Sequence, residues 1–73
     1  MTITGQEALR RGMESAAGES GRVDLVSAHA WFNIAAVLGE ERAVRLRSEA
    51  ASEMTKAELA DALRSAREWM TLH

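Results

Sequence analysis

Apolar residues recur along most of this chain at the spacing of an amphipathic helix, and glycine- or serine-containing segments interrupt the pattern. Near the C-terminus, at about 100° per residue, Leu59, Ala66 and Trp69 fall on one side while Asp61 and Glu68 fall on the other. Proline is absent, so the five glycines are the only strong helix breakers. The pattern predicts an all-α chain of four short helices, at about 5–17, 25–38, 40–53 and 56–70.

Capping signals mark three of the predicted helix starts. Thr4 precedes Glu7, and Thr55 precedes Glu58, at the spacing of a capping box, in which the hydroxyl and the carboxylate each accept a backbone N–H. Asp24 stands directly before the second helix and is expected to be its N-cap. These residues predict where the first, second and fourth helices begin.

The predicted helix at 25–38 differs from the others because it is apolar almost all the way round. One apolar stripe consists of Leu25, Ala28, Trp31, Phe32, Ala35 and Leu38. A second stripe lies behind it and consists of Val26, Ala30, Ile34 and Val37. Because an ordinary surface helix hides only one stripe, this helix is expected to be central. The pattern leaves open whether the last two helices of the same chain or a second chain cover the second stripe.

Length and charge narrow the class of protein. A chain of 73 residues without a linker is expected to form a single small helical domain over residues 1–73, and such a domain buries only about 60% of its unfolded surface. The net charge of −2 disfavours a surface built to neutralise phosphates, so no nucleic acid is expected as primary ligand. No apolar run approaches the roughly 20 residues of a membrane span, and the start lacks the apolar core of a secretory signal. A cytoplasmic protein without a membrane contact is therefore expected.

The sequence offers no convincing catalytic group, since its many carboxylates fall almost all at helix caps or on exposed faces. Cysteine is absent, and only two histidines are present, which disfavours a dedicated metal site. The serines have no evident base and orienting group, so the sequence predicts no enzyme activity and no cofactor. His29 and Asn33 lie one helical turn apart and are expected to be ordinary boundary or surface residues.

The segment VDLVSAHAWFNIAAVLGEERA, residues 23–43, resembles the second half of a Sel-one-like repeat, the longer relative of the tetratricopeptide repeat. Asp24 stands where that family has an aspartate before its second helix. The resemblance implies a repeat core made of Ala28, Trp31, Phe32, Ala35, Ala36, Gly39 and Ala43. Small residues in such a core let the two helices of a repeat approach closely, and the aromatic side chain fills the remaining gap.

Upstream the similarity is weaker, since Arg11 stands where the family usually has leucine and Ser15 where it usually has tyrosine. The first helix of the repeat is therefore either eroded or shifted in register. A single helix-turn-helix repeat is unusual, because such repeats bury their faces against neighbours. Either the last two helices replace a missing repeat, or another chain does.

The function implied by the resemblance is that of a non-catalytic protein–protein interaction module, an adaptor or scaffold. Its expected partners are an unidentified protein and a second copy of the chain, in a dimer. If the last two helices leave it open, the interaction face would be Val26, Ala30, Ile34 and Val37. The alternative is a small regulatory helical protein linked to transcription or nucleic-acid binding, because eight of the nine basic residues are arginine.

Overall fold

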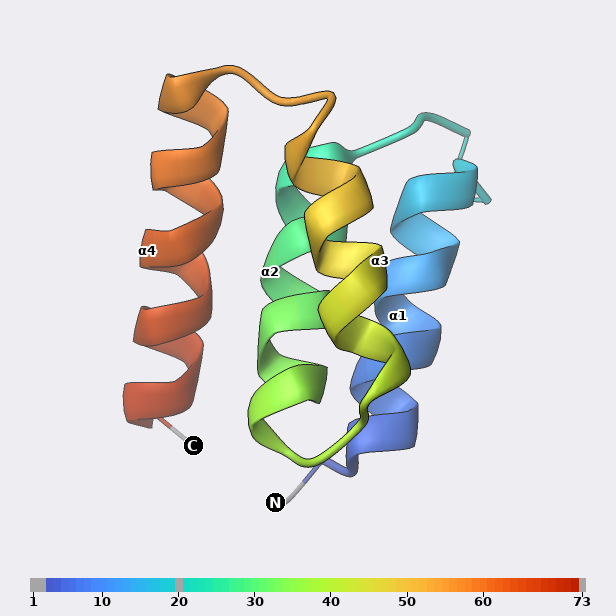
Figure 1. The fold of residues 1–73 in the computed structure, drawn as a ribbon, viewed down its shortest axis with the longest axis vertical. Coiled ribbons are helices and arrows are strands. Elements are labelled where there is room, and N and C mark those ends of the chain that lie inside the picture. The colour runs from blue at the N-terminus through green and yellow to red at the C-terminus, as the bar shows by residue number, and fades with distance from the viewer. Residues whose placement is uncertain (1–2, 20, 73) are drawn as a thin grey trace.

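The computed structural model describes residues 3–19 and 21–72, and all regular elements among them are helices. The four helices are α1 (Gly5–Ala17), α2 (Leu25–Val37), α3 (Arg42–Ala51) and α4 (Lys56–Leu72) (Figure 1). This confirms the predicted all-α class and the number and order of helices. α3 begins and ends inside its predicted range, because Glu41 offers no side-chain cap and residues 52–54 form a turn. α4 extends to Leu72, beyond its predicted end.

The starts of α2 and α4 are held by the capping residues that the sequence predicts. The Asp24 carboxylate accepts the Ser27 backbone N–H at 3.0 Å and the Ser27 hydroxyl at 2.8 Å. At α4 the Glu58 backbone N–H donates to the Thr55 hydroxyl at 3.1 Å, and the Thr55 N–H donates to the Glu58 carboxylate at 2.9 Å. The second pair is a complete capping box, which satisfies backbone donors that the first helical turn leaves free.

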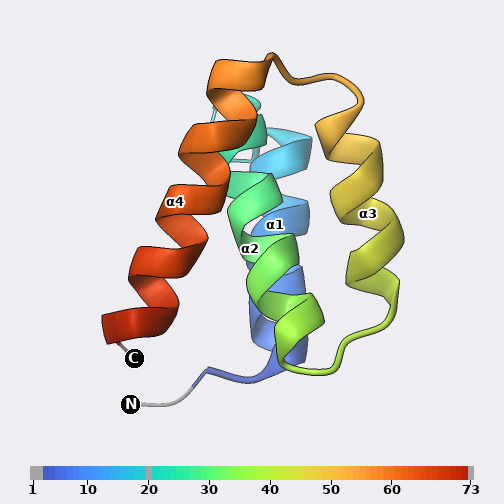
Figure 2. The ribbon, with the colours of Figure 1, turned by 60° about the vertical axis from the view of Figure 1, so that its left-hand side comes forward.

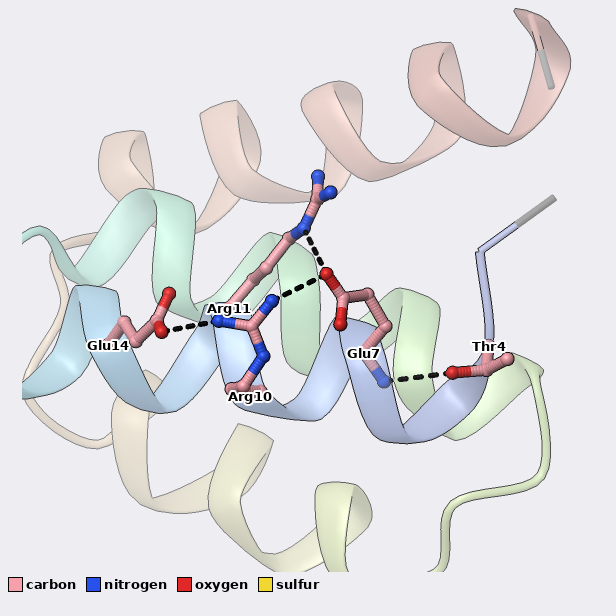
Figure 3. Close-up of polar contacts among 5 residues, drawn as sticks. All are labelled: Thr4, Glu7, Arg10, Arg11 and Glu14. Atoms are coloured by element: carbon pink, nitrogen blue, oxygen red, sulfur yellow. Dashed lines mark hydrogen bonds and ion pairs between the residues drawn. The ribbon is translucent and has the colours of Figure 1, made fainter. Parts of the chain in front are cut away.

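The start of α1 carries only half of the predicted capping box (Figure 3). The Thr4 hydroxyl accepts the Glu7 backbone N–H at 3.0 Å, as expected. The Glu7 carboxylate turns instead to the arginines one helical turn on, at 2.5 Å from Arg10 Nη2 and 3.5 Å from Arg11 Nε. Arg10 also donates to Glu14 at 2.6 Å, so four charged side chains pair along one helix.

α2 is the central helix, with α1, α3 and α4 packed around it (Figures 1 and 2). Helices that follow one another in sequence run in opposite directions, and both views show α3 and α4 on different sides of α2. The question left open by the two apolar stripes of α2 is thus answered within one chain: its own helices surround it. None of the described helices is long and apolar enough to cross a membrane.

Alanine dominates the buried core. The described buried hydrophobic residues include only three large side chains, Leu9, Phe32 and Ile34. The others are Ala8, Ala28, Ala30, Ala35, Ala43, Ala50, Ala62 and Ala66. Alanine side chains where two helices meet let the helix backbones approach closely. Each large side chain in the core therefore fits into a narrow space. Gly12 of α1 is buried as well, beside Phe32 of α2.

An aromatic pair joins α4 to α2. The rings of Trp31 and Trp69 meet edge to face, with centroids 5.5 Å apart and planes at 69°. On the α1 side the guanidinium carbon of Arg11 lies 5.0 Å from the centroid of Trp31. Trp31 therefore contacts a cation from α1 and an aromatic ring from α4, and both contacts are favourable for its π system.

Candidate functional site

The residues predicted for the repeat core do not share one environment. Four of them are buried in the centre of the fold, namely Ala28, Phe32, Ala35 and Ala43. Trp31 and Ala36 are partly buried and pack against that core. Gly39 is exposed in the turn after α2, with φ 96°, a backbone conformation that favours glycine. The turn alone therefore explains why a glycine stands at position 39.

The four residues of the candidate interaction face are separated by the packing of α3 and α4. Ala30 and Ile34 are buried, with exposed fractions of 8% and 2%, in the same core as Ala66 of α4. Val26 is partly buried, while Val37 near the end of α2 is 64% exposed. The condition for an intermolecular face, that the last two helices leave these residues open, is not met at Ala30 and Ile34. Ala30 and Ile34 instead pack in the core of the single chain and stabilise its fold.

His29 is placed differently from the expectation for a boundary or surface residue. Its exposed fraction is 3%, and its Nδ1 has no hydrogen-bond partner within the described residues. One turn on, Asn33 accepts a hydrogen bond of 2.7 Å from Arg47 Nη1 of α3. Burial, and secondarily the charge of Arg47, lower the pKa of His29 below its ordinary value. The surface expectation is wrong for His29, because α2 is enclosed on this side.

Most arginines in the described part of the chain lie beside a carboxylate. The described part of the chain contains no group of three His, Cys, Asp or Glu residues that could hold a metal ion. The arginines that pair with a nearby carboxylate are Arg10, Arg11, Arg42, Arg45 and Arg64. This local pairing weakens the alternative of a nucleic-acid-binding protein, which needs cations free to meet phosphates.

An open, mainly apolar groove of about 510 Å³ lies between the C-terminal halves of α1 and α3, whereas a second hollow of about 540 Å³ beside Trp31 has a more polar lining. Leu25 and Phe32 of α2 contribute to its lining between these two helices. The other apolar lining residues are Met13, Ala16, Ala17, Val23, Leu46 and Ala50. We call this feature the α1–α3 groove.

Two lining residues keep much of their apolar surface in water. Met13 is 49% exposed and Val23 is 54% exposed. Among the described residues, the charged side chains that line the groove are Glu49 of α3 and Glu53 in the turn after α3, so the charged part of its lining is acidic. Glu49 lies 3.7 Å from Arg45, and both are well exposed, whereas Glu53 has no ion pair in the part of the chain that the structure describes.

The groove arises from short side chains where two helices diverge. Ala16 and Ala17 end α1, and Ala50 lies near the end of α3. Their methyl groups leave space between the helices, and Leu25 and Phe32 of α2 line that space. Sequence reasoning missed this site because the separation of α1 and α3 depends on how both cross α2. The paired alanines at 16 and 17 were the available signal.

Comparisons with protein-family models, with curated proteins and with solved structures find no match. The similarity of residues 23–43 to a Sel-one-like repeat therefore stays a prediction, and the α1–α3 groove is assessed on its geometry alone.

Proposed function

We propose that this chain is a non-catalytic helical protein–protein interaction module, an adaptor or scaffold that also self-associates, and that the α1–α3 groove is its docking surface. The observation that carries the proposal is the open apolar groove with Met13 and Val23 half exposed. A helix laid in an apolar groove is a common mode of protein recognition.

Docking of a partner would bury apolar surface that remains exposed to solvent in the folded chain. Complete burial of one methionine or valine side chain contributes about 1.5–3 kcal/mol, so covering the exposed halves of Met13 and Val23 contributes about 2 kcal/mol together. Leu46 already packs against the buried core beside Phe32, so this part of the groove is preformed, which limits the ordering cost of association.

Sedimentation velocity from low to high micromolar concentration tests the proposal. We expect the average mass of the wild-type chain to rise with concentration and that of Met13→Glu to stay at one chain. Val44→Glu is the matched control, since Val44 is 48% exposed but does not line the groove. Circular dichroism checks that each variant is folded. A wild-type chain that remains monomeric throughout contradicts the self-association, and equal effects of the two variants contradict the role of the groove.

A further inference from the structure

One flank of α4 carries an exposed stripe that combines two basic residues with a leucine and an alanine. Lys56, Ala60, Leu63 and Arg67 recur at intervals of four, three and four residues, which places them on one side of a helix. All four are exposed, and Leu63 keeps 45% of its surface in water. We call these four residues the α4 stripe.

The acidic side chains of α4 lie away from the α4 stripe. Asp61 and Glu68 lie about 100° or more away from the centre of the stripe, so the stripe itself is purely basic. Neither Lys56 nor Arg67 makes an ion pair with any residue that the structure describes. The stripe therefore presents a leucine between two cations that are not paired.

The α4 stripe complements the α1–α3 groove in shape and in charge. The groove is concave and mainly apolar, with Glu49 of α3 and Glu53 of the following turn on one side. The stripe is convex, with Leu63 one turn before Arg67. A helix laid along α3 can place Leu63 in the groove and Arg67, one helical turn further on, beside the acidic side chains.

We propose that the α1–α3 groove of one copy of this chain receives the α4 stripe of a second copy. The proposal rests on the self-associating function argued above and identifies the two surfaces that meet. Two grooves set face to face would leave both hollows unfilled and would leave Lys56 and Arg67 unmatched. The contact is therefore between different surfaces on the two copies.

One contact of this kind leaves one groove and one stripe open on the two copies. These two surfaces pair with each other in a closed two-fold dimer, or they bind further copies in a ring or a chain. The average mass of the wild-type protein is thus expected to reach at least that of a dimer as its concentration rises.

Mixing two variants tests this arrangement. Leu63→Glu places a carboxylate beside Glu49 and Glu53 and is expected to weaken association about tenfold or more. Met13→Glu disables the groove but leaves the stripe intact. Each variant alone should be monomeric at concentrations where the wild type associates, and an equimolar mixture should form a heterodimer that grows no further, because only one productive contact remains. Leu72→Glu, on another side of α4 at 80% exposure, should associate like the wild type.

The outcomes separate this inference from the proposed function. A mixture of Met13→Glu and Leu63→Glu that stays monomeric overturns the pairing of groove and stripe. Wild-type-like association of Leu63→Glu, with loss in Met13→Glu, also overturns it and leaves the groove as an interaction surface with a different occupant. A wild-type chain that does not associate overturns both. Circular dichroism spectra equal to the wild type are required of every variant.

Discussion

The ring of Phe32 occupies the space that a side chain at Gly12 would need. A Cβ placed on Gly12 would lie 2.5 Å from Phe32 Cε1 and 2.6 Å from Cδ1. The next contact is the backbone oxygen of Ala28 at 3.3 Å. The close packing of α1 against α2 therefore depends on the absence of a side chain at Gly12 and on the ring of Phe32 opposite it.

We expect Gly12→Ala to destabilise the fold. Overpacking of this kind costs about 1–3 kcal/mol, which exceeds the gain of about 1 kcal/mol from the higher helix propensity of alanine. Urea unfolding followed by circular dichroism measures the change. The control is the same substitution in a Phe32→Leu background, where the smaller side chain leaves room and the cost should shrink or reverse. An equal cost in both backgrounds would show that the ring is not the cause.

Buried His29 makes stability depend on pH. Its pKa is lowered in the folded state, so the unfolded chain binds the proton more readily. The free energy of unfolding should be constant above the ordinary pKa of 6.5 and should fall as pH drops below it towards the folded value. Unfolding at about pH 7.5 and about pH 5.5 tests this, because histidine is the side chain that ordinarily titrates between them. His29→Leu should lose most of the difference. An unchanged pH dependence in the variant would rule out His29 as its source.

Helix starts and the central place of α2 are predictable from the sequence. Asp24 and Thr55 cap the helices that their spacing predicts, because an N-cap depends on residues only three positions apart. The two apolar stripes predict that α2 is surrounded. Glu7 shows the limit of local reasoning, since its spacing fits a capping box but two arginines compete for the carboxylate.

Burial of single residues and the groove depend on how helices cross. His29 and Asn33 form a polar pair one helical turn apart, which favours a place at the helix boundary, yet α3 approaches closely enough for Arg47 to reach Asn33. The sequence pattern left Ile34 as a possible contact for a second chain, but in the structure its exposed fraction is 2%. The α1–α3 groove exists only because both helices pack on α2 at particular angles, which no periodicity specifies.

The hydrogen bond between Arg47 and Asn33 ties α3 to α2 and places a positive charge near His29. Arg47→Met removes both, and loss of a part-buried hydrogen bond costs about 0.5–1.5 kcal/mol. The pKa of His29 should rise towards its ordinary value but remain below it, because burial is the larger cause of the shift. An NMR titration of the imidazole measures this change. Arg45→Met is the control, since Arg45 is exposed and pairs only with Glu49. A His29 pKa that does not move would contradict the electrostatic contribution of Arg47.

The Asp24 cap separates a hydrogen-bond effect from a charge effect. Asp24→Ala should destabilise the chain by about 1 kcal/mol, the usual cost of a lost N-cap. Asp24→Asn should retain most of the stability at neutral pH because an amide oxygen can accept the same N–H. The Ser27 hydrogen bonds lower the pKa of Asp24, so its contribution is present above the ordinary value of 3.8 and is lost as pH falls through the folded value. Acid titration of stability should therefore differ between aspartate and asparagine, and parallel curves would contradict the assignment.

The Trp31–Trp69 pair should govern how firmly α4 is attached. α4 packs mainly on α2, and an edge-to-face aromatic pair contributes about 0.5–1.5 kcal/mol beyond its buried area. Trp69→Leu keeps an apolar side chain but removes this pair, so amide hydrogen exchange should become faster along α4 before it changes in α1 and α2. Leu72→Ala, at an 80% exposed position on the same helix, is the control and should leave exchange unchanged. Uniform acceleration across all four helices would instead show that α4 unfolds only together with the rest of the chain.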